Sequence, residues 1–277
     1  MTPDIPPIGL GTDQNTALED DFEVDFEACV ETVTNAIEIG YRHIDTAQIY
    51  GTEPCVGAAI ERSTVPRDDL FVATKVHYQR AEYEDALESV EQSLEDLGLE
   101  QIDLLYVHWP AGTYDPEGTL RAFNELHDRG VVANVGVSNF TPALLDEARD
   151  LLEPPIVAHQ VELHPLLQQT ELREYAERHD HRMVAYSPLI RGRVGDVPEL
   201  ASVAAKHDVS PAQVSLAWMA QKDVVPVPKA SSETHRRENA EAIRLELDDE
   251  DIDTIDSIDQ EQRIIDFEFA PWNDERN

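Results

Sequence analysis

The chain has 277 residues and a formal net charge of −36, because 57 Asp and Glu stand against 21 Lys and Arg. So negative a surface is repelled by nucleic-acid phosphates and by anionic membranes, and we expect neither as a partner. A hydrophobic content of 41% is too high for a disordered acidic chain, and we find neither a leader peptide nor the ~20 apolar residues that span a bilayer, which predicts a folded, cytoplasmic protein.

Short β-branched runs alternate with longer amphipathic stretches throughout the sequence. The runs predict strands at residues 8–11, 41–46, 70–76, 102–108, 131–137, 156–163, 183–187 and 224–228. The amphipathic stretches predict helices at residues 30–37, 56–62, 87–97, 120–129, 142–152, 171–178, 199–207, 211–221 and 234–245. Strands that alternate with helices pair in parallel, and eight such units predict a closed (β/α)8 TIM barrel as one domain over residues 1–277. An open doubly wound sheet is the alternative.

Two further segments follow the eighth unit. Ile252, Ile255 and Ile258 recur every three residues among acidic ones, which predicts a surface helix over residues 247–263. Residues 264–272 are apolar and aromatic. The sequence does not decide whether they cover the mouth of the barrel or pad its side.

Barrel enzymes carry their reactive groups at the carboxyl ends of the strands, and four unusual residues satisfy this rule. Asp45, Lys75 and His108 end predicted strands, and Tyr50 lies in the loop after the second strand. Taken singly, Asp45 reads as a helix cap, Tyr50 as a core aromatic and His108 as a buried histidine. Lys75 is harder to explain in this way, because an unpaired ammonium in a buried strand is costly, and Asp45 on the neighbouring strand is the expected partner.

Together these four residues have the chemistry needed for proton transfer. A tyrosine with a pKa near 10 exchanges protons poorly at neutral pH unless a nearby cation lowers that pKa, and Lys75 is expected to be that cation. Asp45 would keep the ammonium charged, and His108 would position a substrate carbonyl beside Tyr50. This arrangement predicts carbonyl reduction.

Six segments then resemble the aldo-keto reductase family along nearly the whole chain. They are GYRHIDTAQIYG at 40–51, TKV at 74–76, DLLYVHWP at 103–110, GVSNF at 136–140, QVELHP at 160–165 and AYSPL at 185–189. The resemblance is to the small prokaryotic type that includes 2,5-diketo-gluconate and methylglyoxal reductases. It implies that Asp45, Tyr50, Lys75 and His108 form the catalytic tetrad.

The resemblance also implies NADPH as the cofactor, with NADH as a possible substitute. Ser138, Asn139 and Gln160 would bind the carboxamide, and Tyr186 would stack on the nicotinamide. The remaining contacts implied are Thr12, Asp45, Ser187, Leu189, Lys229, Ser231, His235, Glu238 and Asn239, of which Ser187 and Leu189 would contact the pyrophosphate. A helix that begins after the last strand would favour the phosphate of the adenosine end.

One position departs from the family pattern. Where many relatives carry an arginine that grips the 2′-phosphate, this chain has His235, which is only partly charged near neutral pH. The neighbouring Arg236 is a candidate substitute whose direction the sequence does not give. NADPH remains the expected preference.

Two other patterns are weighed as sites and set aside. His159, Glu162 and His164 have the composition of a metal site, but on a strand His159 points away from the face that Glu162 and His164 share, so we expect no metal. Cys29 and Cys55 are too few for a disulfide scaffold and are expected to be buried thiols.

The expected substrate is a small carbonyl compound, namely a simple aldehyde, a dicarbonyl such as methylglyoxal, or an open-chain keto sugar. Trp109 beside His108 is expected to form a wall of the pocket together with Tyr50 and His108. A sugar or alcohol dehydrogenase that runs the same site in reverse, and a non-catalytic subunit that senses the cofactor, are the alternatives. The high negative charge slightly favours a monomer.

The basic residues are also unequally divided, since only Lys75, Lys206, Lys222 and Lys229 are lysines. High negative charge with little lysine predicts a halophilic protein that works in concentrated salt, where charge repulsion is screened over ~3 Å at 1 M.

Overall fold

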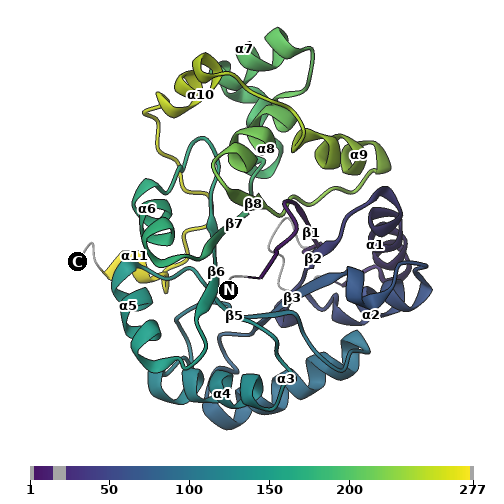
Figure 1. Cartoon of the computed structure of the whole chain (residues 1–277), viewed down its shortest axis with the longest axis vertical. Helices are drawn as coiled ribbons and strands as arrows, with labels where there is room; N and C mark the ends of the chain where they lie inside the picture. Colours follow the sequence, from purple (N-terminus) through teal and green to yellow (C-terminus); the bar gives the residue numbers. More distant parts are fainter. Residues whose placement is uncertain (1–2, 15–22, 275–277) are drawn as a thin grey trace.

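The computed structural model describes residues 3–14 and 23–274. Eight parallel strands lie in sequence order in one sheet, which the helices surround (Figure 1). The strands are β1 (Gly9–Gly11), β2 (His43–Asp45), β3 (Phe71–Val76), β4 (Leu104–Val107), β5 (Val135–Ser138), β6 (Ile156–Glu162), β7 (Arg182–Tyr186) and β8 (Val224–Pro226). The predicted TIM barrel is confirmed, and the open sheet is excluded.

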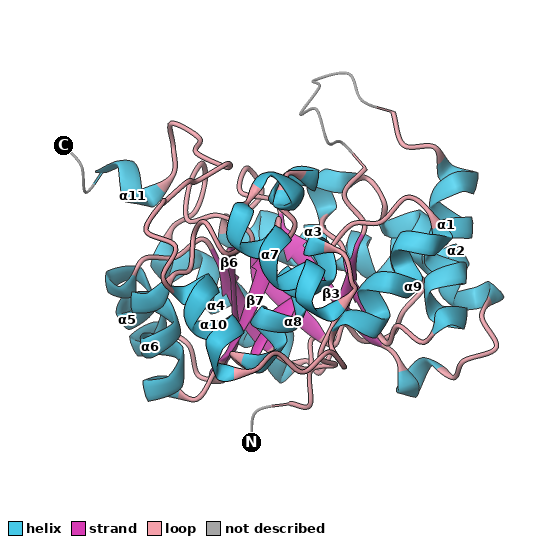
Figure 2. Ribbon diagram, turned by 90° about the horizontal axis from the view of Figure 1, so that it is seen from above, coloured by secondary structure: helices cyan, strands magenta, loops and turns pink. Residues whose placement is uncertain are grey.

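Helices form the outer layer around the strands (Figure 2). They are α1 (Phe26–Ile39), α2 (Glu53–Arg62), α3 (Tyr83–Leu97), α4 (Pro116–Asp128), α5 (Pro142–Leu151), α6 (Thr170–His179), α7 (Pro198–His207), α8 (Pro211–Gln221), α9 (Glu233–Ala242), α10 (Asp249–Asp256) and α11 (Pro271–Asp274). None of the described helices is long and apolar enough to cross a membrane. Cys29 and Cys55 are buried free thiols, as expected.

The sheet closes between its first and last strands. Gly11 N donates to the Pro228 carbonyl at 3.2 Å. A Cβ at position 11 would lie 2.8 Å from the Val227 carbonyl oxygen, so only glycine allows the two strands to approach this closely.

Alternation along the strands separates two cores. Ala73, Leu104 and Tyr106 belong to the cluster inside the barrel, whereas Val72 and Leu105 belong to the cluster between strands and helices. Because residues two apart share a face, Lys75 follows Ala73 into the barrel interior at its carboxyl end.

The predicted surface helix over residues 247–263 is too long. Helix α10 begins after a capping box formed by Asp248 and Asp251 and ends at Asp256. Beyond α10 the chain contacts the loop that follows β6, where Gln262 N donates to the Leu166 carbonyl at 2.7 Å. This tertiary contact replaces the helical hydrogen bonds that the isoleucine spacing suggested.

Candidate active site

The four candidate catalytic residues meet at the carboxyl ends of neighbouring strands. Asp45 ends β2, Lys75 lies one residue before the end of β3, and His108 directly follows β4. Tyr50 ends the short 3-10 helix η1 (Gln48–Tyr50), which follows β2. The barrel therefore brings these residues to one mouth.

Lys75 and Asp45 form a buried ion pair, as the sequence predicted. Lys75 Nζ donates to Asp45 Oδ1 at 2.6 Å and to the Thr46 carbonyl at 2.8 Å, and the lysine side chain has no exposed surface. Gln160 Nε2 crosses the barrel from β6 and donates to Asp45 Oδ2 at 2.7 Å. Both carboxylate oxygens of Asp45 thus have a side-chain partner, which fixes the position of the carboxylate beside the ammonium.

Tyr50 and His108 face each other above this pair. Their rings are 5.8 Å apart in an edge-to-face arrangement, and Lys75 Nζ lies 5.1 Å from the centre of the Tyr50 ring. Burial lowers the pKa of His108 well below its ordinary value, and the charge of Lys75 lowers it further. A neutral imidazole beside a phenol can hold a carbonyl oxygen through hydrogen bonds.

The expectation that Lys75 lowers the pKa of Tyr50 is wrong for this arrangement. Burial raises that pKa well above 10, and the carboxylates of Asp45 and Asp13 raise it further. Burial is the largest of these effects, and the Asp45 carboxylate adds to it although it also pairs with Lys75 at 2.6 Å. Tyr50 is therefore held protonated, in the form that can donate a proton.

The residues expected to hold the carboxamide also converge on this mouth. Asn139 directly follows β5 and has a left-handed backbone conformation, with a φ of 64°. Its Nδ2 donates to the His108 carbonyl and to Ser138 Oγ, both at 3.0 Å, while the Tyr186 hydroxyl donates to its Oδ1 at 2.8 Å. Asn139 thereby links Ser138, Tyr186 and the loop that carries His108.

Two loops flank these residues where the pyrophosphate is expected. Ser187 follows β7 in a left-handed conformation, φ 51°, and Leu189 directly precedes the 3-10 helix η3 (Ile190–Gly192). On the other side, Thr12 is buried and its Oγ1 donates to the Asp45 carbonyl at 3.1 Å. Thr12 therefore joins the first strand to the catalytic residues.

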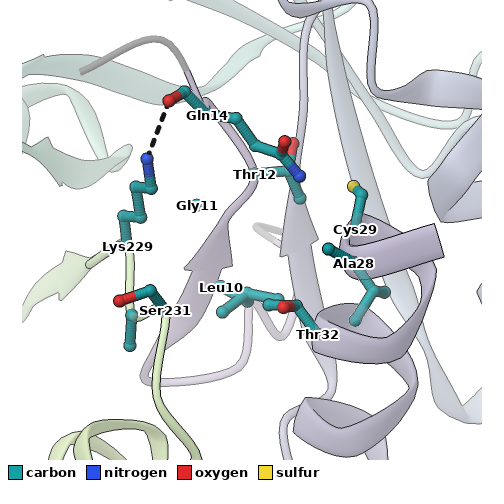
Figure 3. Close-up of a pocket in the computed structure, with 11 residues that line it drawn as sticks. Leu10, Gly11, Thr12, Gln14, Ala28, Cys29, Thr32, Lys229 and Ser231 are labelled. Atoms are coloured by element: carbon teal, nitrogen blue, oxygen red, sulfur yellow. Dashed lines mark hydrogen bonds between the residues drawn. The ribbon is translucent and has the colours of Figure 1, made fainter. Parts of the chain in front are cut away.

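The expected adenosine end lies between β8 and α9. Lys229 and Ser231 line a pocket of about 230 Å³ together with residues of β1 and α1 (Figure 3). The Lys229 ammonium donates to the Gln14 carbonyl at 3.0 Å. This pocket is lined by two of the residues expected to bind the adenosine end, and Tyr50 is not among its lining residues.

Helix α9 supplies the remaining expected contacts. Ser232 caps its first turn by accepting from His235 N at 3.2 Å. His235 is exposed, Glu238 is half-buried, and Asn239 is buried with an Nδ2 that has no partner in the described part of the chain. A helix N-terminus next to a lysine fits a phosphate, and an unpartnered buried amide fits a nucleobase.

Arg236 does not substitute for the missing arginine. It is 5% exposed, and its Nη1 donates to the carbonyls of Ala230 and Ser231, each at 3.1 Å. Its Nε donates to Asn35 Oδ1 at 2.8 Å. The guanidinium therefore points into the protein and supports the Lys229 loop from behind.

Trp109 lies beside His108 but faces the chain terminus. It is 5% exposed and its ring is 5.6 Å from Phe267, 5.5 Å from Phe269 and 5.6 Å from Trp272. We call Trp109, Phe267, Phe269 and Trp272 the aromatic wall. The sequence left the place of residues 264–272 undecided, and the structure sets them against Trp109 and Tyr186 at the mouth.

The side chains considered as a metal site point in two directions, as strand geometry predicts. His159 turns outwards, where its Nε2 accepts from Phe140 N at 3.3 Å. Glu162 instead bonds His164 Nε2 at 2.9 Å and the backbone N–H groups of Ile264 and Ile265. Sequence reasoning missed these two backbone partners of Glu162.

The structure is thus a TIM barrel with a tyrosine, a histidine and a buried lysine–aspartate pair at one mouth. The aldo/keto reductase family model matches residues 7–260, and the chain belongs to this family. The family resemblance found in the sequence is thereby confirmed.

Individual relatives agree with this assignment. The chain is 41% identical to a glyoxal reductase of Bacillus subtilis over 84% of each protein, and 33% identical to the methylglyoxal reductase DkgB of Escherichia coli O157:H7 over 97% of this chain and 99% of that one. Among solved structures, the aldo-keto reductase AKR2E5 complexed with NADPH shares 31% identity and a TM-score of 0.85, covering 94% of this chain and 86% of the other.

Proposed function

We propose that the protein reduces small aldehydes, dicarbonyls or keto sugars to alcohols with NADPH, and that Tyr50 is the general acid. The observation that carries the proposal is the placement of Tyr50 beside His108, with their rings 5.8 Å apart, above the Lys75–Asp45 ion pair. The glyoxal and methylglyoxal reductases among the relatives support small dicarbonyls as the first substrates to test.

The chain's own residues fit the cofactor. Asn139, Gln160 and Tyr186 would hold the nicotinamide end, and Lys229 and the start of α9 would hold the adenosine end. NADPH bound there supplies the hydride. Lys229 and the helix N-terminus favour the extra phosphate of NADPH, whereas His235 contributes less charge than an arginine. We therefore expect a modest preference for NADPH over NADH.

The tetrad residues divide the work of proton transfer. Tyr50 Oη donates its proton to the oxygen of the carbonyl as that oxygen gains negative charge. His108 holds the same oxygen in place through a hydrogen bond. Lys75, held by Asp45, lies 5.1 Å from the centre of the phenol ring, so the ion pair keeps a fixed charge distribution beside the group that gives up its proton.

The test is NADPH oxidation in molar KCl against methylglyoxal, simple aldehydes and keto sugars, with Tyr50→Phe beside the wild type. We expect kcat to fall by about 100- to 10,000-fold, because the phenol acts as an acid only in the transition state. The dissociation constant for NADPH, measured by fluorescence titration, should stay within a factor of about two. Parallel assays with NADH compare kcat/KM for the two cofactors.

Each alternative has its own outcome. A Tyr50→Phe enzyme with wild-type kcat removes Tyr50 from the mechanism. Turnover of alcohols or sugars with NADP+, and of no carbonyl compound, favours the dehydrogenase. Tight NADPH binding with no turnover in either direction favours a sensing role.

A further inference from the structure

Glu162 is a buried carboxylate that the tetrad does not use. It is the last residue of β6, and neither its side chain nor that of His164 has exposed surface. Burying an ionised carboxylate is costly unless hydrogen bonds replace its water. His164 is its only side-chain hydrogen-bond partner in the described part of the chain. The remaining hydrogen bonds must therefore explain why the carboxylate is there.

Those hydrogen bonds come from the chain terminus. Glu162 Oε1 accepts from Ile264 N and Oε2 accepts from Ile265 N, both at 2.7 Å. The donors lie 102 and 103 residues further along the sequence. Two adjacent N–H groups on one carboxylate form a fork that fixes both the position and the direction of the backbone.

The fixed backbone leads directly into the aromatic wall. Figure 1 shows the chain passing from α10 beside β6 to α11. Phe267 and Phe269 follow Ile265 by two and four residues and stack on each other at 5.1 Å, and Phe269 also stacks on Tyr78 at 5.0 Å. The other side of the wall is Trp109, the residue after His108.

We propose that Glu162 is a positioning residue that sets the aromatic wall beside the catalytic mouth and thereby determines affinity for substrates with an apolar or aromatic group. This inference rests on the proposed reductase function for its substrate, but the geometry it describes does not. Trp109 directly follows His108 in the chain, so we expect the wall to contact the part of a substrate that extends beyond its carbonyl group, such as the ring of an aromatic aldehyde, more than a small dicarbonyl.

The test replaces the acceptor without changing its size. In Glu162→Gln the amide oxygen can still accept from one backbone N–H, but the NH2 group faces the other, so two donors meet and the fork loses one of its two hydrogen bonds. We expect KM for 4-nitrobenzaldehyde to rise at least fivefold, while kcat and KM for methylglyoxal stay within twofold. A purely structural role would lower kcat for both substrates together.

A readout independent of turnover separates this inference from the proposed function. Two of the three tryptophans, Trp109 and Trp272, belong to the wall. Glu162→Gln should shift the tryptophan emission to longer wavelength and speed proteolytic cleavage after Arg263. Both signals report whether Glu162 holds residues 264–272 in place, even if the wild type reduces none of the compounds.

Two further variants complete the experiment. Asp251→Asn is the matched control, because Asp251 is also a buried carboxylate near the chain terminus but bonds Lys206 and His207 away from the mouth, and it should leave KM and emission unchanged. Glu162→Asp keeps the charge but shortens the reach, and should show the same changes in smaller size. Unchanged emission and unchanged KM for 4-nitrobenzaldehyde in Glu162→Gln, or in Glu162→Asp if the first variant does not fold, would overturn the proposal.

Discussion

Lys75 and Asp45 place two opposite charges where water does not reach them. Their attraction at 2.6 Å offsets the cost of removing both from water, but replacing such a pair by apolar residues is often neutral for stability. The pair is therefore better explained by its position under Tyr50 than by any gain in folding free energy. Removing only one of the two residues leaves a buried charge without its partner, which destabilises the folded protein.

At the residue scale we predict that Lys75→Met destabilises the protein by about 3–5 kcal/mol, because it leaves the Asp45 carboxylate buried with Gln160 as its remaining side-chain partner. Urea unfolding in molar KCl measures the change. The double variant Lys75→Met with Asp45→Asn should recover most of the loss, since no buried charge is left. A single variant as stable as the wild type contradicts the prediction.

The meeting of these four residues at one mouth could be predicted from sequence, because three lie at strand ends, Tyr50 lies in the loop after one, and a buried lysine demands a neighbouring carboxylate. The pKa of Tyr50 could not, because it depends first on how deeply the phenol is buried. Glu162 was missed for a similar reason. Its partners are backbone N–H groups more than 100 residues away, and a backbone donor leaves no mark in a sequence.

At the scale of elements, the outer face of β6 and the start of β7 hold two neutral histidines against α6. His159 and His181 have rings 6.2 Å apart, and Tyr175 of α6 lies 5.9 Å from His181. Burial lowers the pKa of His159 from 6.5 to about 3, and His181 lowers it further. Burial, Arg149 and His179 together lower the pKa of His181 to about 4, despite the opposing charge of Asp180.

These shifts predict acid destabilisation in a defined window. An unfolded histidine takes up its proton near pH 6.5 while the folded one does not, so stability present above pH 6.5 is lost as the pH falls towards 4. The loss approaches about 1.4 kcal/mol per pH unit for each histidine. Urea midpoints between pH 7 and pH 4.5 at constant KCl measure it.

The matched comparison is His159→Gln with His181→Gln. Gln at position 159 can still accept from Phe140 N, and neither Gln titrates. The slope of stability against pH in this window should be shallower in the double variant by up to about 3 kcal/mol per pH unit. Equal slopes would show that other groups cause the acid sensitivity.

The order and type of elements were predictable from hydrophobic period, but their ends were not. The predicted strands over residues 102–108 and 131–137 shrink to β4 and β5. Asp103 Oδ2 accepts from Val72 N at 2.8 Å and Asn134 Nδ2 donates to the Asp103 carbonyl at 2.8 Å. Side chains thus take over hydrogen bonds at the start of these strands, which apolar patterning does not reveal.

At the scale of the whole molecule, the charge of −36 is spread over the outer helix faces. Helix α3 shows how, since its inner face carries Ala86, Val90 and Leu97. Its outer face exposes acidic side chains in every turn, namely Glu84, Asp85, Glu88, Glu91 and Glu95. Like charges at this density repel one another at low ionic strength and destabilise the compact state.

We therefore expect the Tm to rise with KCl from dilute buffer to molar salt, by ~2–4 °C for each kcal/mol of repulsion that is screened. Sucrose stabilises by exclusion without screening charge and serves as the solvent control. Replacing Glu84, Glu88 and Glu95 by Gln should raise the Tm in dilute buffer and leave it nearly unchanged in molar KCl, because only unscreened repulsion is removed. A wild-type Tm and circular dichroism spectrum that do not change with KCl would remove the basis for a halophilic protein, and would show that the short-range contacts of the barrel outweigh its net charge.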